Sequence, residues 1–174
     1  MTYDQTEVEH FRQQKALFFR RNKNAPLRGD AVEGMNYFPI STEFVFEAKL
    51  EPLQTAQRVW FAMSRGEAEA YIPEALAHFD YAGNTYTLVL YRPDGSDDSS
   101  RLFMPFTDSS NGQETYPAGR YLEVVPERET ARLDFNFAYN PYCAYSEQFR
   151  CPIPPKENRL DFAVQAGEKS YQAP

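Results

Sequence analysis

Cysteine and histidine are scarce in this chain, whose 174 residues include two of each. Cys143 and Cys151 lack the spacing of a zinc knuckle, and the scattered His10 and His78 complete no four-ligand set, so no metal site is predicted. A catalytic Cys143 would need a base, usually histidine, within hydrogen-bond reach, and both histidines lie far from it in the sequence. The sequence favours two small buried thiols over a nucleophile or a disulfide, and it leaves their pairing open.

Long apolar runs and an excess of positive charge are also lacking. Lysine and arginine number 18 against 25 aspartates and glutamates, which gives a net charge of −7. Nucleic-acid binding needs a clustered basic surface, and a bilayer span needs about 20 apolar residues, so neither partner is expected. The acidic N-terminus lacks the basic start and apolar stretch of a secretion signal, which predicts a soluble cytoplasmic protein.

Glycine is scarce too, with 8 residues against 13 prolines, 12 tyrosines and 14 phenylalanines. The sequence contains no phosphate-loop, dinucleotide-binding or hydrolase-elbow motif, each of which needs glycines at fixed spacing. A composition rich in aromatic rings and proline favours strands and rigid loops over helices. The length suits one domain over residues 1–174.

One segment, residues 6–23, has the periodicity of an amphipathic helix. Thr6 and Glu9 have the spacing of a capping box at its start, and basic residues fill its last turn, where the helix dipole favours cations. Four apolar side chains share one helical face: Val8, Phe11, Phe18 and Phe19.

Strand-like alternation replaces the helical period from residue 43 onward. We expect strands at 43–50, 57–63, 77–82, 85–91, 101–106, 120–125, 132–139 and 159–166. The turn Ala82-Gly83-Asn84 predicts a hairpin between its two flanking strands. Segment 92–100 has no apolar residue and is predicted to be a mobile loop. Seven or eight short strands with one helix predict a mainly β fold, a small antiparallel barrel or sandwich over residues 43–166 with the N-terminal amphipathic helix packed on it.

Polar residues that a plain barrel does not need gather in three stretches of the C-terminal half: residues 106–121, 133–146 and 151–159. In the first stretch, Asp108 and Glu114 are close enough in sequence to pair with Arg120. An arginine held by a carboxylate can clamp an anionic ligand, or it can staple the loop to the barrel, which we favour.

The second stretch is interpreted as a strand with two different faces. Alternation sends Leu133, Phe135, Phe137 and Tyr139 to one face, and Asp134, Asn136 and Ala138 to the other. Asn140-Pro141 ends this strand because proline has no N–H for the ladder. In the third stretch, prolines impose a stiff extended path that suits a loop laced across a barrel mouth.

A site built from these stretches would combine aromatic walls with a few fixed polar groups, as small-molecule sites usually do. The candidate ligand-binding residues are Asp108, Glu114, Tyr116, Arg120, Tyr121, Asn136, Tyr139, Asn140, Tyr145, Glu157 and Asn158. The first hypothesis is a module that binds a small organic or anionic ligand. The alternative is an enzyme with Glu114 or Glu157 as acid or base and Arg120 as the group that stabilises negative charge. A third interpretation is that the polar cluster is purely structural. The oligomeric state does not follow from the sequence.

Four motifs in these stretches resemble a bacterial family, the domain-of-unknown-function family numbered 1684. They are LFMPFTD at 102–108, ETYPAGRYL at 114–122, LDFNFAYNPYCAY at 133–145 and CPIPPKENRL at 151–160. Pro117 stands where the family usually has glycine, which should stiffen the loop without removing Arg120. The resemblance implies no activity, because the family has none established. It does imply a kinship with flavin-binding split barrels and so suggests flavin as a cofactor, although no flavin-contacting motif carries over residue by residue.

Overall fold

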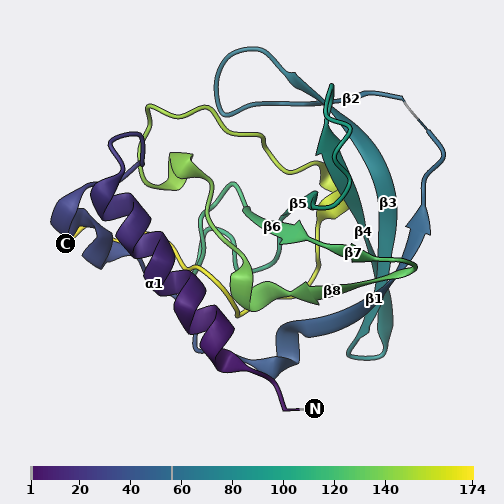
Figure 1. Ribbon diagram of the computed structural model, residues 1–174, viewed down its shortest axis with the longest axis horizontal. Helices are drawn as coiled ribbons and strands as arrows, with labels where there is room; N and C mark the ends of the chain where they lie inside the picture. The colour runs from purple at the N-terminus through teal and green to yellow at the C-terminus, as the bar shows by residue number, and fades with distance from the viewer. Residues whose placement is uncertain (1, 56) are drawn as a thin grey trace.

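The computed structural model describes residues 2–55 and 57–174, and these residues form a mainly β protein with one α-helix near the N-terminus (Figure 1). Eight antiparallel strands make one sheet in the order β6-β5-β4-β3-β1-β8-β7, and β2 also pairs with β3. Their bounds are β1 (Val45–Pro52), β2 (Val59–Phe61), β3 (Glu69–Tyr81), β4 (Asn84–Pro93), β5 (Leu102–Phe106), β6 (Arg120–Val124), β7 (Pro126–Glu127) and β8 (Thr130–Asp134). The predicted fold class is confirmed.

The sheet curls into a nearly closed barrel because the chain beyond β8 returns to β6. The Tyr121 N–H donates to the Tyr139 carbonyl, and the Tyr139 N–H donates to the Tyr121 carbonyl, both at 2.9 Å. Inward-facing side chains of the strands fill the interior, among them Phe46, Leu88, Leu90, Met104, Leu122 and Leu133. The barrel interior is therefore a packed core, and a ligand site has to lie outside it.

Helix α1 (Gln5–Arg21) confirms the helix predicted over residues 6–23. Its N-cap is Asp4, whose carboxylate accepts a hydrogen bond from the Thr6 N–H at 2.9 Å. The predicted cap, Thr6, was wrong because Thr6 already lies in the first helical turn, where its own N–H is bound by the Asp4 carboxylate. Within residues 2–55 and 57–174, every helix falls short of the length and apolar character that a bilayer crossing demands.

The predicted hairpin is confirmed, with Tyr81 paired to Asn84. Ala82 and Gly83 both have positive φ, 50° and 82°, as a two-residue turn of primed type requires. Strand β3 is longer than predicted and starts at Glu69. The loop predicted over residues 92–100 begins at residue 94, because Arg92 and Pro93 still belong to β4, and its mobility stays a prediction.

Two predicted strands were wrong in part or in whole. Strand β8 ends at Asp134, because its carboxylate accepts the Asn136 N–H at 3.1 Å and turns the chain into a 3-10 helix instead of a strand to residue 139. Segment 159–166 is not a strand. It forms an isolated parallel β-bridge, in which Arg159 pairs with Thr107, the residue that follows β5. The 3-10 helices are η1 (Gly29–Gly34), η2 (Thr42–Phe44), η3 (Phe135–Phe137), η4 (Tyr142–Ala144) and η5 (Lys156–Asn158).

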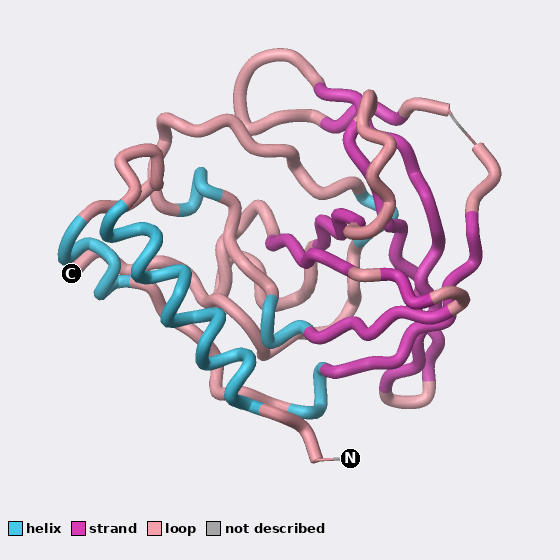
Figure 2. Tube along the Cα trace, in the orientation of Figure 1, coloured by secondary structure: helices cyan, strands magenta, loops and turns pink. Residues whose placement is uncertain are grey.

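Loops dominate the half of the molecule between α1 and strands β5 and β6 (Figure 2). The chain after β8 runs through this half. Phe19 of α1 packs edge-to-face against Tyr142 and Tyr145, with ring centroids 5.6 Å apart in each pair. This packing fixes the loop-rich half between the helix and the barrel.

Candidate functional site

Arg120 and Asp108, the predicted ion pair, meet in the interior at one end of the barrel. The side chains of both are completely buried, and Arg120 Nη2 donates to Asp108 Oδ2 at 2.7 Å. The two terminal nitrogens also donate to the carbonyls of Val164 (2.8 Å), Ala166 (2.5 Å) and Glu168 (3.1 Å). Burial lowers the pKa of Arg120, and the Asp108 charge opposes that shift. These hydrogen bonds hold the C-terminal segment against the end of the barrel. The geometry therefore favours a structural role for Arg120 over the binding of an anionic ligand.

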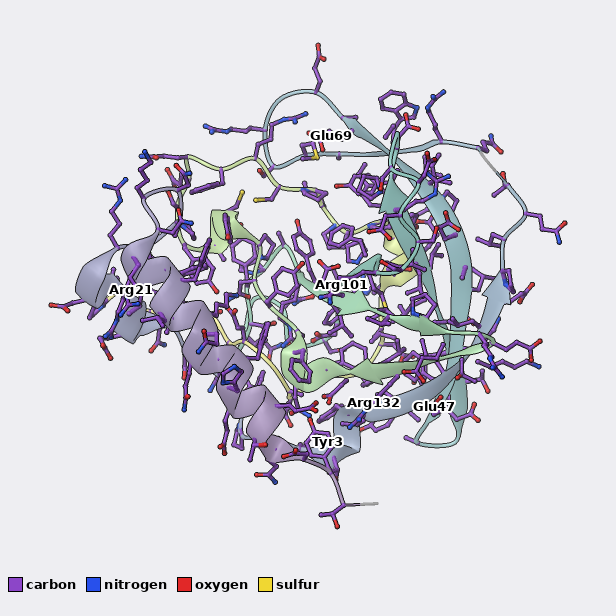
Figure 3. All side chains as sticks on the ribbon, in the orientation of Figure 1. Tyr3, Arg21, Glu47, Glu69, Arg101 and Arg132 are labelled. Atoms are coloured by element: carbon purple, nitrogen blue, oxygen red, sulfur yellow. The ribbon has the colours of Figure 1, made fainter. Side chains whose placement is uncertain are left out.

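Asn136 and Asn158 also have structural partners. Asn136 accepts from the Ser41 N–H (3.0 Å) and donates to the Ser41 carbonyl (2.8 Å) and to Tyr3 (3.1 Å). Figure 3 shows Tyr3 and Arg132 next to each other beside β8, where the guanidinium carbon lies 5.2 Å from the ring centroid. Asn158 is fully buried against β4 and β5.

The structure does not bring the two predicted acid-base residues to Arg120. Glu114 and Glu157 are exposed, and neither is among the hydrogen-bond partners of Arg120 within the described part of the chain. Glu114 accepts from Gln165 at 3.0 Å. Tyr116 is half-buried, and burial raises its pKa.

Tyr145 belongs to a different cluster, under helix α1. Its hydroxyl donates to Glu168, which also pairs with Lys15. The Lys15 Nζ lies 5.2 Å from the centroid of the Tyr139 ring and 5.7 Å from that of Tyr145. Burial and the neighbouring Glu168 carboxylate raise the pKa of Tyr145. This cluster holds the helix against the C-terminal segment.

The remaining candidates, Tyr121, Tyr139 and Asn140, line one cavity of about 400 Å³. It lies between the outer face of the barrel and the chain from residue 139 to residue 152. Its other walls are Tyr71, Phe103, Pro141, Tyr142, Phe149, Arg150, Cys151 and Pro152. Three of the predicted site residues therefore line one cavity outside the sheet, and ligand binding there stays a prediction.

Strand alternation explains why this outer face is aromatic. On β5, Leu102, Met104 and Phe106 point into the core, so Phe103 points outward. On β6, Leu122 and Val124 point inward, so Tyr121 points outward. Four rings form a row, in which the distance between neighbouring ring centroids is 5.7 Å for Tyr71 and Phe103, 4.8 Å for Phe103 and Tyr121, and 5.7 Å for Tyr121 and Tyr139. The cavity thus has a continuous aromatic floor.

Most polar groups of the cavity are already held by the protein. The Tyr121 hydroxyl donates to the Pro152 carbonyl, and the Tyr139 hydroxyl donates to Glu123 at 2.5 Å. Burial raises the pKa of both phenols and that of the Cys151 thiol, so these groups are neutral at pH 7. The Arg150 guanidinium is engaged by Glu69 and by backbone carbonyls.

The side-chain amide of Asn140 has one paired and one unpaired polar atom. Its Nδ2 donates to the Lys169 carbonyl at 2.9 Å, which assigns the amide orientation. Its Oδ1 is buried and has no hydrogen-bond partner among the residues that the structure describes. A buried carbonyl without a donor costs about 1–3 kcal/mol, and Asn140 is one of the residues that line the cavity.

The sequence did not identify Tyr71, Phe103, Phe149 or Cys151 as site residues. A signal for Phe103 was present, because large aromatic residues at the outward positions of a strand are unusual on a purely solvated face. No signal connected Tyr71 to this cavity, since its contact with Phe103 depends on the strand order.

Comparison with known proteins identifies relatives without an assigned activity. The sequence profile of the family described as "Protein of unknown function (DUF1684)" matches residues 30–169. The solution NMR structure of an uncharacterized protein from Haloarcula marismortui is similar, with 34% sequence identity and a TM-score of 0.75 over 95% of this chain and 93% of the other. Among curated proteins, none matches the chain.

Proposed function

The chain belongs to the DUF1684 family, whose description gives no function, and we propose from the site itself that it binds a small neutral aromatic molecule in the cavity between β5, β6 and residues 139–152. The observation that carries the proposal is the buried, unpartnered Oδ1 of Asn140 beside an aromatic floor. Such a site suits a planar ligand that donates one hydrogen bond.

The charge of the site argues for a neutral ligand over an anion. The Arg120 guanidinium points into the barrel and binds Asp108 and three carbonyls, so it offers nothing to the outer face. Arg150 already binds Glu69, and the carboxylate of Glu123 lies close to the cavity through its bond to Tyr139. An anion would approach a carboxylate without an uncommitted cation to offset it.

The acid-base enzyme hypothesis has less support from the geometry. Glu114 and Glu157 are exposed, and neither lines the aromatic cavity. Exposed carboxylates that do not share a cavity with an electrophilic group cannot transfer a proton to one bound ligand. We therefore propose binding as the function and leave the acid-base pair out of it.

The test uses a matched pair of probes and a matched pair of variants. p-Cresol and p-xylene have the same shape, but only p-cresol donates a hydrogen bond, so we expect p-cresol to bind about tenfold more tightly. Phe103→Trp should fill the cavity and abolish the stabilisation by p-cresol in a thermal melt. Phe18→Trp, on the exposed face of α1, is the control and should retain it.

Two outcomes count against the proposed function. The first is equal binding of the two probes, because it would remove the role of Asn140. The second is loss of p-cresol binding in Phe18→Trp and not in Phe103→Trp, because it would move the site to the helix. Native mass spectrometry of the freshly purified protein would detect a retained ligand, and a visible absorbance spectrum would test the flavin expectation.

A further inference from the structure

Cys151 lines the aromatic cavity, and hydrogen bonds connect it with Cys143 and Ser64. The Cys143 N–H donates to Cys151 Sγ at 3.3 Å, and the Cys143 thiol donates to the Phe149 carbonyl at 3.0 Å. The Cys151 N–H donates to Ser64 Oγ at 3.0 Å, and Ser64 Oγ lies 3.2 Å from Cys143 Sγ. Both thiols are free. Two thiols eight positions apart in the chain are thus held together by the fold.

The hydrogen-bond directions identify Ser64 as a donor to sulfur. The Ser64 oxygen already accepts from the Cys151 N–H, and the Cys143 proton is directed to Phe149. The Ser64 hydroxyl proton is then free to point at Cys143 Sγ. A hydroxyl donor stabilises a sulfur that gains negative charge, so the arrangement favours reaction at Cys143.

The surroundings favour oxidation over metal binding. Within residues 2–55 and 57–174, no cluster of three or more His, Cys, Asp or Glu side chains is arranged to hold an ion. Cys143 is partly exposed, whereas Cys151 is 8% exposed. Burial raises the pKa of the Cys151 thiol to about 12, and its side-chain bond with Cys143 adds to the shift. Cys151 stays protonated at pH 7, which leaves Cys143 as the first thiol to meet an oxidant.

We propose that Cys143 and Cys151 form a reversible disulfide when a small peroxide oxidises Cys143. The Cys143 sulfur, after losing its proton, attacks one peroxide oxygen and breaks the O–O bond. The sulfur is oxidised to a sulfenic acid, and the leaving hydroxide takes the released proton to become water. The Cys151 sulfur then attacks the sulfenic sulfur, the S–S bond forms, and the hydroxyl leaves with the Cys151 proton as a second water.

The disulfide would alter the wall of the cavity. It has no S–H group, so the bond from Cys143 to the Phe149 carbonyl is lost. The Phe149 ring packs against Tyr142 with centroids 5.1 Å apart, and both rings line the cavity. Oxidation therefore changes the contacts of the segment between the two cysteines, whether or not a ligand is bound.

The experiment treats the purified full-length protein with hydrogen peroxide and digests it with trypsin. Cleavage after Arg150 places the two cysteines on separate peptides, so a linked pair of peptides reports the disulfide. We expect this linked pair in the wild type, its disappearance after dithiothreitol, and no change in subunit mass on a non-reducing gel. Independent overoxidation of both cysteines, or a disulfide between two chains, would overturn the proposal.

Three variants separate the steps. In Cys151→Ser, Cys143 should stop at the sulfenic acid and form an adduct with dimedone, whereas Cys143→Ser should form none. Ser64→Ala should slow disulfide formation about tenfold, the effect of one lost hydrogen bond to the reacting sulfur. An unchanged rate in Ser64→Ala with a normal melting temperature would contradict the role of that hydroxyl. If a cysteine variant does not fold, the peptide link in the wild type still decides the proposal.

Discussion

The sequence identifies Arg120 as a partner of Asp108, but it allows both a ligand-binding and a structural role for this residue. Its proximity to Asp108 in the chain predicted the pair, and the structure contains it. The carbonyls of Val164, Ala166 and Glu168 lie 44 to 48 residues away in the sequence, so no local pattern could reveal them. These three acceptors decide between a ligand clamp and a staple.

Replacing Arg120 by alanine is expected to lower the free energy of unfolding by about 4 kcal/mol. The variant leaves the buried Asp108 carboxylate without its cation and three buried carbonyls without a donor. Urea denaturation measures the change. Arg120→Lys should recover only part of it, because one ammonium group cannot reproduce the planar set of donors.

Arg101 is the control for this substitution, because its side chain is exposed. Arg101→Ala should change the free energy of unfolding by less than about 0.5 kcal/mol. A loss below about 1 kcal/mol in Arg120→Ala would contradict the structural role and return Arg120 to the ligand-binding candidates.

At the level of elements, Asn158 joins β4 and β5 where their backbones do not pair. The register between these strands includes Tyr91 and Phe103, and Pro105 of β5 has no N–H to give. Asn158 accepts from the Val89 N–H and donates to the carbonyls of Val89 and Pro105, each at 2.8 Å. One side-chain amide thus replaces missing ladder bonds.

Asn158→Ala is therefore expected to destabilise the protein by about 3 kcal/mol, because three backbone groups lose their partner. Hydrogen exchange should show faster exchange of the Val89 amide in the variant. Asn24→Ala, at an exposed position, should leave both measurements unchanged. Unaltered protection of the Val89 amide would show that another group satisfies it.

Local patterns predicted the elements that depend on nearest neighbours. The helix, the hairpin and the alternation of β5 and β6 follow from side-chain period and turn residues. Apolar and polar residues also alternate in segment 159–166. Two of its carbonyls, however, accept hydrogen bonds from the Arg120 side chain instead of from a neighbouring strand. The alternation after Asp134 ends because that carboxylate caps a turn. The alternation of apolar and polar residues does not reveal which side chains bind backbone groups.

Across the whole molecule, the aromatic rings buried in the barrel core are phenylalanines, whereas the outer cavity combines tyrosines with Phe103 and Phe149. Phe46, Phe106 and Phe135 belong to the barrel core. Tyr121 and Tyr139 belong to the outer cavity, where their hydroxyls find polar partners. The division follows from the hydroxyl, because a phenol is stable at the boundary of a core only when its O–H is bonded.

This distribution predicts an alkaline limit to stability. Burial raises the pKa of Tyr91, Tyr121 and Tyr139 above the value of about 10 that they have in the unfolded chain. Above pH 10 the folded state holds more protons than the unfolded state, so the free energy of unfolding falls as the pH rises. Below about pH 10 these tyrosines do not lower the free energy of unfolding. Above about pH 10, each of them lowers it by about 1.4 kcal/mol per pH unit.

Absorbance of ionised tyrosine during an alkaline titration measures this effect. Fewer than the 12 tyrosines should ionise before the protein unfolds, and the rest should ionise together with unfolding. The same titration in concentrated urea, where all tyrosines are exposed, is the reference. Ionisation of all tyrosines near pH 10 in a protein that stays folded would contradict the burial of these phenols.

The central claim is that a neutral aromatic molecule binds between the barrel's outer face and residues 139–152, and an NMR titration with p-cresol tests it most directly. A chain of this size gives resolvable amide spectra, so each site residue can be followed separately. The predicted result is saturable shifts of the Phe103, Tyr121, Asn140 and Cys151 amides, with those around Asn24 unmoved. Binding weaker than about 1 mM, or saturable shifts confined to α1, would contradict the claim.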